Sequence, residues 1–150
     1  MQSYVNLVKG LVQTGQEYLN QIRPDSKQDP MKIDKSQTLY EARCFNESQV
    51  EPAKCAKVIK NLIYHFNRGE TFTEEETNFL FFGITKLFFS EDPVLRRSVY
   101  MIVKEMTSQP SIYIVTSSLM KDIHHKSVNF RRNSLKIIPL VIDPSNLVQV

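Results

Sequence analysis

NFLFFGITKLFF, residues 78–89, holds five of the chain's nine phenylalanines. Five of its residues repeat at about 100° per residue, the spacing of one apolar helix face, and they are Leu80, Phe81, Ile84, Leu87 and Phe88. Phe79, Phe82 and Phe89 point away from that face. A helix over this stretch must therefore bury two sides or present one of them to a partner.

The size and composition are those of one folded domain. Of 150 residues, 41% are hydrophobic and 10% are aromatic, which is enough to bury a core and excludes a wholly disordered chain. The 19 basic and 16 acidic residues are interspersed and give a formal charge of +3. A charge this small predicts neither a nucleic-acid partner nor membrane attachment through bulk charge.

No segment has the pattern of a membrane span or a secretory signal. The longest apolar run near the end, residues 137–142, is too short to cross a bilayer and contains Pro139. The N-terminus lacks a basic region followed by an apolar one. Cys44 and Cys55 follow no metal-binding spacing. Two such cysteines are typical of reduced thiols in a cytosolic protein.

The first 36 residues are interpreted as an N-terminal extension. Residues 4–22 have apolar residues at a helical spacing, which Gly10 and Gly15 weaken, so a weak helix is expected. Residues 23–36 are polar and contain two prolines, a composition typical of a linker. Residues 37–150 are expected to form the folded part.

The first half of that folded part predicts three helices. A short helix is expected over residues 37–45. A longer one starts near Pro52, which suits a first helical turn, and ends before Gly69, which suits a C-cap. The next starts at Thr73, because Glu76 three residues later completes a capping box.

The second half predicts three more. A helix from Pro93 has inward positions at Val94, Leu95, Val99, Ile102, Val103 and Met106. Residues 112–123 are rich in β-branched side chains, which makes a strand the local alternative. We predict a helix, since the apolar residues keep a helical spacing and no other segment could pair as a strand. Residues 127–142 form the last predicted helix.

An internal repeat indicates how these helices are arranged. Leu95-Arg96-Arg97-Ser98-Val99 recurs 35 residues later as Phe130-Arg131-Arg132-Asn133-Ser134. A period of this size in helical pairs is typical of a solenoid. We therefore expect an all-α fold, a right-handed α-solenoid of HEAT- or armadillo-like helical hairpins. The chain ends in what resembles the start of a further helix, so it is expected to be truncated.

No motif predicts catalysis. Ser118-Leu119-Met120-Lys121 matches the S-x-x-K pattern of serine acyl enzymes without its accompanying motifs, and an amphipathic helix explains it better. His124 and His125 diverge on a helix and cannot share a metal. No glycine-rich phosphate loop occurs. We expect a binding protein with no enzymatic activity, cofactor or metal.

Several blocks resemble the gamma subunits of the COPI coatomer, a family related to the large adaptin subunits of clathrin adaptors. They occur in the family's order, cover about residues 37–145, and are EARCFNE (41–47), GE (69–70), FFGITKLF (81–88), DPVLRR (92–97), KEM (104–106) and IVTSSLMKD (114–122). Residues 1–36 show no clear resemblance.

This resemblance implies the N-terminal part of an adaptin-like α-solenoid trunk. Such a trunk is cytosolic and is recruited to Golgi membranes by a GTP-loaded ADP-ribosylation factor. It serves in the COPI coat, peripheral on Golgi membranes and COPI vesicles, in transport from the Golgi to the endoplasmic reticulum and within the Golgi. Its partners are the other coatomer subunits, and contact with the zeta subunit is expected to need the missing part of the trunk.

The resemblance also implies where the GTPase docks. The matching positions are Phe82 and Thr85, with Val115 or Thr116 on a neighbouring helix. Lys86 shares the face of Phe82.

Two alternatives remain open. Phe79 and Phe89 are expected to pack against an adjacent repeat rather than bind the GTPase. The chain could instead be an armadillo-type scaffold that binds a peptide in its concave groove near Arg96 or Arg131. The paired arginines could hold phosphates or lipid headgroups, although ion pairs between repeats explain them more simply.

Overall fold

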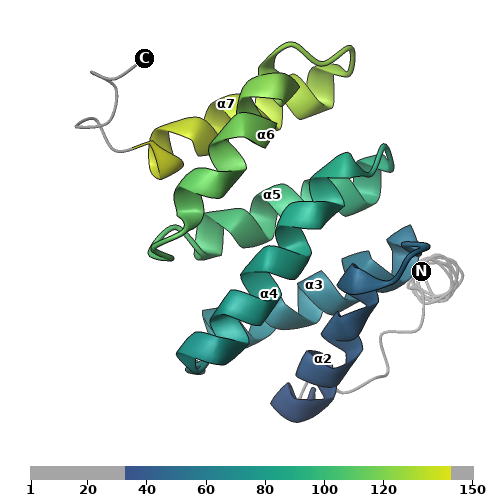
Figure 1. The fold of residues 1–150 in the computed structure, drawn as a ribbon, viewed down its shortest axis with the longest axis vertical. Coiled ribbons are helices and arrows are strands. Elements are labelled where there is room, and N and C mark those ends of the chain that lie inside the picture. Colours follow the sequence, from purple (N-terminus) through teal and green to yellow (C-terminus); the bar gives the residue numbers. More distant parts are fainter. Residues whose placement is uncertain (1–32, 143–150) are drawn as a thin grey trace, which may run out of the picture. The chain divides into compact units, whose positions relative to one another are not determined.

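The computed structural model describes residues 33–142, and every regular element within them is helical (Figure 1). The elements, with 3₁₀ turns labelled η, are α2 (Lys35–Glu41), η2 (Ala42–Asn46), α3 (Pro52–Asn67), α4 (Glu74–Lys86), η3 (Leu87–Phe89), α5 (Pro93–Glu105), η4 (Ile112–Val115), α6 (Thr116–Ile123) and α7 (Val128–Val141). The prediction of an all-α fold is confirmed. The expected helix over residues 4–22 and the linker up to residue 32 lie outside the described residues.

Most helix ends lie where the local signals predicted them. Pro52 opens α3, and Gly69 follows that helix with a φ of 72°, a conformation that glycine adopts without strain. The capping box of α4 is complete. The Thr73 hydroxyl accepts from the Glu76 amide at 3.1 Å, and the Glu76 carboxylate accepts from the Thr73 amide at 2.9 Å.

Two segments differ in detail from the prediction. Helix α2 begins two residues early, because the Asp34 carboxylate accepts from the Gln37 amide at 2.9 Å and caps the helix there. The segment 112–123 is helical as predicted, but its β-branched start forms the 3₁₀ turn η4 rather than an α-helical turn.

The helices pack in hairpins whose members follow one another along the chain. α3, α5 and α7 lie side by side in that order, and α6 packs on α7 to form the last hairpin (Figure 1). α4 packs on η2, and η3 connects it to α5. This is the arrangement of an α-solenoid, as the repeat predicted. No helix among the described residues is long and apolar enough to cross a membrane.

The predicted apolar face of α4 is the core of the domain. Leu80, Phe81 and Ile84 are completely buried, and the following Leu87 and Phe88 are at least 94% buried. One inward position of α5 was predicted wrongly. Val94 is 59% exposed, because it lies about 120° around the helix from the centre of the buried stripe.

A buried arginine joins the last hairpins. Arg96 of α5 is 2% exposed, and its Nη2 donates to the Asp122 carboxylate of α6 and to the Tyr100 hydroxyl. Its Nη1 donates at 2.6 Å to the carbonyl of Phe88 in η3. The Phe130 ring of α7 lies 4.4 Å from the guanidinium carbon. One cation therefore connects η3, α5, α6 and α7.

Tyr100 completes this buried network. Its hydroxyl donates to the Asp122 carboxylate at 2.6 Å. Burial raises the pKa of the Tyr100 phenol, and the hydrogen bond to Asp122 raises it further, so the phenol keeps its proton and remains a donor.

The sequence repeat has a structural counterpart. Nη1 of Arg96 donates to the carbonyl six residues earlier, that of Ser90, at 3.3 Å. Nη1 of Arg131 donates to the carbonyl six residues earlier, that of His125, at 2.7 Å. In each repeat the first arginine of the pair therefore holds the turn that precedes its own helix. The structural interpretation, an ion pair between repeats, is confirmed for Arg96, whereas Arg131 hydrogen-bonds to backbone carbonyls and has no ion pair within residues 33–142.

Adjacent arginines should differ sharply in their effect on stability. We expect Arg96→Met to lower the free energy of unfolding by about 3 kcal/mol or more, because it leaves the Asp122 carboxylate buried without its cation. Arg97→Met removes an exposed side chain and should change it by less than about 0.5 kcal/mol. Urea unfolding of the 150-residue chain measures both, and equal effects would contradict the network described here.

The two cysteines face each other in the core. Cys44 and Cys55 are free thiols, at most 2% exposed, with their sulfurs 3.4 Å apart. Burial raises the pKa of both thiols, and for Cys55 burial and the hydrogen bond that it shares with Cys44 raise the pKa to about 12. Both therefore stay protonated in the folded protein at neutral pH.

Thiol reactivity follows from these pKa values. Because the thiolate is the reactive form, the folded chain should react with Ellman's reagent far more slowly than the chain in urea at about pH 8. Raising the pH to about 9 should accelerate the unfolded chain only about threefold, because its thiols are already partly ionised, and the folded chain by up to about tenfold from a much lower rate, because the thiolate fraction rises tenfold per pH unit below the pKa. Rapid labelling of the native protein would show that the thiols are accessible.

Candidate functional site

The side of α4 that faces away from the core is rich in exposed aromatic rings. Phe79 is 41% exposed, Phe82 45% and Phe89 86%. These exposures confirm the prediction that Phe79, Phe82 and Phe89 point away from the apolar face of the helix. Phe89 does not pack against another repeat within residues 33–142, so that expectation was wrong for the described part of the chain. We call Phe79, Phe82, Thr85 and Lys86 of α4, together with Phe89 of the following turn η3, the outer face of α4.

Polar groups on the outer face are fixed by neighbouring residues. The Thr85 hydroxyl donates to the Phe82 carbonyl at 2.8 Å, one turn back in the helix. The exposed Lys86 ammonium donates to the Asn46 side-chain carbonyl in η2 at 2.5 Å. No carboxylate among the described residues pairs with Lys86. The outer face of α4 therefore presents an aromatic surface with one cation, Lys86, whose charge is not neutralised by a carboxylate of the described residues.

A glycine sets the position of this face. Gly83 is buried, and a Cβ added there would lie 3.1 Å from the Cβ of Phe45 in η2. Phe45 is only 1% exposed and belongs to the core, so it has little room to move. The lack of a side chain at Gly83 thus allows η2 and α4 to pack closely, which holds Phe82 at its angle to the core.

The two sites expected on the neighbouring helix differ from each other. Val115 is 1% exposed, because the 3₁₀ turn η4 directs it into the core, so it cannot touch a partner directly. Thr116, the first residue of α6, is half-buried. The exposed apolar residues of η4 are Tyr113 and Ile114. The structure therefore groups Phe82, Thr85 and Lys86 on one helix and leaves Thr116 on a separate element.

Sequence reasoning missed one aromatic residue beside this face. Tyr40 of α2 is 64% exposed and lines, with Phe79, an open pocket of about 350 Å³ between α2 and α4. The Arg43 guanidinium lies over its ring at 5.1 Å. Helical phase could have found it, since Thr38 and Ala42 on the opposite side of the turn are buried.

The described residues contain no metal cluster, in that no three His, Cys, Asp or Glu side chains converge within them. Ser118 is half-buried and Lys121 is exposed. Neither is hydrogen-bonded to the other in residues 33–142, as a lysine-activated serine would require.

Comparison with known proteins identifies the family. The family model of the adaptin N-terminal region matches residues 34–149. The chain belongs to this family. It is 46% identical to coatomer subunit gamma of Arabidopsis thaliana over 121 residues, which cover 80% of this chain and 14% of that protein.

Other adaptin-family relatives agree. Coatomer subunit gamma of Dictyostelium discoideum is 44% identical over 79% of this chain, and coatomer subunit gamma-1 of Homo sapiens is 40% identical over 77%. The chain spans 13% of the length of each of these two. These identities confirm the resemblance to coatomer gamma subunits that the sequence blocks indicated.

The close packing at Gly83 gives a direct prediction. Gly83→Leu should lower the free energy of unfolding by about 1–3 kcal/mol, because the new side chain has no room against Phe45. In a Phe45→Ala background the same substitution should cost clearly less, since the cavity left by the ring receives the leucine. Thermal unfolding of the four proteins measures this coupling, and an equal cost in both backgrounds would show that Gly83 and Phe45 do not compete for space.

Proposed function

We propose that this chain acts as part of a non-enzymatic COPI coat subunit of the gamma type. The support is its identity of 40–46% with coatomer gamma subunits of plants, an amoeba and mammals. In this proposal it works from the cytoplasm, peripheral on Golgi membranes and COPI vesicles, in transport from the Golgi to the endoplasmic reticulum and within the Golgi. It assembles there with the other coatomer subunits and needs no cofactor of its own.

The proposed partner of the outer face of α4 is a GTP-loaded ADP-ribosylation factor. The observation that carries this proposal is the exposure of Phe82, 45% of a large ring on a helix whose opposite side is fully buried. Exposed aromatic rings on a rigid helix are typical anchors of protein interfaces, because they bury much apolar surface at little entropic cost. The switch regions of such GTPases present apolar surface in their GTP form.

Thr85 and Lys86 add polar contacts around this anchor. Lys86 has no carboxylate partner in the described part of the chain, so an acidic group of the GTPase can pair with it at the rim of the interface. Thr85 lies one turn from Phe82 and is half-exposed. Thr116 contributes from the start of α6, whereas Val115 supports the site from the core.

Replacement of the anchor tests the proposal. Phe82→Asp should reduce capture of the GTP-loaded factor by about tenfold or more, because a carboxylate replaces an apolar contact at the centre of the interface. Its helical circular dichroism and melting temperature should remain close to those of the parent chain, since the ring is half-exposed. Calorimetric titration with the factor in its GTP and GDP forms measures the affinity.

Leu135→Asp provides a matched control. Leu135 is 56% exposed on α7, so the variant introduces the same charge at an equally exposed apolar position away from α4. It should bind the GTP-loaded factor like the parent chain. If Phe82→Asp binds normally, or if it unfolds while Leu135→Asp does not, the outer face of α4 is not the docking surface.

A further inference from the structure

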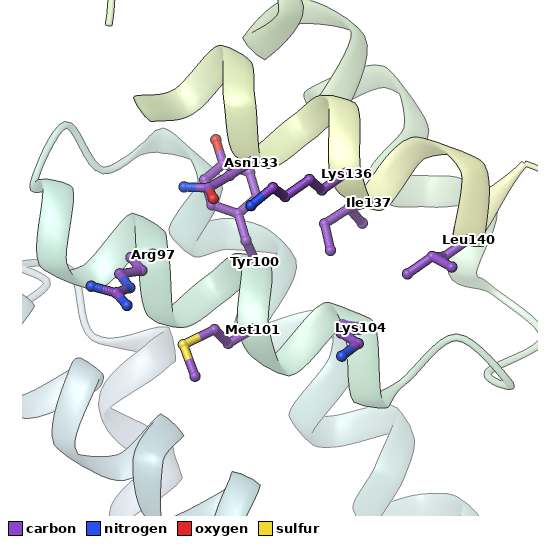
Figure 2. A pocket seen from close by; sticks show the side chains of 8 residues that line it. All are labelled: Arg97, Tyr100, Met101, Lys104, Asn133, Lys136, Ile137 and Leu140. Carbon is purple, nitrogen blue, oxygen red and sulfur yellow. The ribbon is translucent and has the colours of Figure 1, made fainter. Parts of the chain in front are cut away.

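A basic groove runs along the seam between α5 and α7. Two open pockets, of about 490 and 330 Å³, share Arg97, Asn133 and Lys136 in their walls and therefore adjoin along one depression. Figure 2 shows the larger pocket, with Arg97 and Lys104 extending from α5 and Lys136 from α7. Arg132 of α7 lines the smaller one. We call Arg97, Lys104, Arg132 and Lys136 the basic groove.

The four cations of the groove are available for a ligand. All four side chains are exposed, and none has an ion-pair partner within residues 33–142. α7 contains no acidic residue, and α5 contains one, Glu105 at its end. Four like charges that line one groove without ion-pair partners in residues 33–142 repel one another, and an anionic ligand would relieve that repulsion.

The two arginines of each pair have different roles. Arg96 and Arg131 are used inside the fold, where they hold carbonyl groups of the preceding turns. Arg97 and Arg132, the second members, extend into the groove. Arg96 is buried and Arg131 is engaged by backbone carbonyls, so the second arginine of each pair is the one available to a ligand.

The floor of the groove is apolar. Met101 and Leu140 are about half exposed, and Ile137 lies beside them in the wall of the larger pocket (Figure 2). The residues of α5 that line the depression lie between Pro93 and Lys104, eleven positions apart, which makes it about 16 Å long at the rise of an α-helix. This length accommodates about five residues of an extended chain.

We propose that the basic groove binds an acidic peptide segment of a partner protein, with apolar side chains placed among its carboxylates. The carboxylates pair with the four cations, and the apolar side chains contact Met101 and Leu140. A peptide fits these features better than a membrane, because a flat bilayer surface cannot reach an apolar floor set between two helices. This site lies on α5 and α7 and does not depend on the outer face of α4.

A binding titration with defined peptides tests the proposal. The probe is a fluorescein-labelled peptide with the repeat Glu-Glu-Leu, measured by fluorescence anisotropy with the 150-residue chain. It should bind, and its Kd should rise with salt because charge pairs at the rim are screened. A Glu-Glu-Ser peptide should bind more weakly, since it has no apolar side chain for the floor, and a Lys-Lys-Leu peptide should not bind.

Variants locate the site. Arg97→Glu/Lys136→Glu should weaken binding of the Glu-Glu-Leu peptide by about tenfold or more. Lys121→Glu/Lys126→Glu makes the same change of charge at exposed lysines of α6 and the loop after it, and should have little effect. If the first variant unfolds, Arg97→Gln/Lys136→Gln, which adds no repulsive charge, provides the same comparison.

Other outcomes would overturn the proposal. Equal loss of affinity in both double variants would mean that net charge, not the groove, attracts the peptide. Binding to vesicles of phosphatidylcholine and phosphatidylserine without binding to the peptide would make the groove a lipid-binding surface instead. Phe82→Asp should bind the peptide normally, so a failure at the groove remains distinguishable from a failure of the GTPase surface.

Discussion

The buried ion pair between Arg96 and Asp122 is the interaction on which the C-terminal hairpins depend. A charged guanidinium in the core is costly unless its charge is paired, and here carbonyls, a carboxylate and aromatic rings surround Arg96, although its Nε has no hydrogen-bond partner within residues 33–142. These partners come from η3, α6 and α7, so the pair forms only when α5 packs against all three. It thereby specifies one register of the solenoid. Arg96 is used in this way, and its neighbour Arg97 is left at the surface.

Much of this fold could be predicted from local sequence signals. The helix starts at Pro52 and Thr73, and the stop at Gly69, follow from capping chemistry that acts over a few residues. The buried and exposed sides of α4 could be distinguished from the sequence, because the helical period places Phe82 on the opposite side of the helix from the buried Leu80 and Ile84. The repeat of the arginine pairs predicted a solenoid, since equal spacing along the chain places equal groups at equal positions in successive hairpins.

The remainder depends on packing between distant segments, which no local pattern encodes. Val115 belongs to an apolar helical pattern, but only the 3₁₀ geometry of η4 shows that it faces the core. The need for a glycine at position 83 depends on Phe45, which is distant in sequence and packs directly against it. Likewise, the sequence could not assign separate roles to Arg96 and Arg97, because Asp122 and Phe130 decide which of them is buried.

These features combine into a scaffold with two distinct surfaces, an aromatic one on α4 and a basic one between α5 and α7. The rigid core beneath Phe82 makes the aromatic surface ready to bind without rearrangement. The central claim is that this ring contacts an ADP-ribosylation factor directly. Photo-crosslinking with benzoylphenylalanine in place of Phe82 tests it most directly. We predict a crosslink to the GTP-loaded factor and none to the GDP-loaded form, whereas equal crosslinking of both forms, or of neither, would contradict the claim.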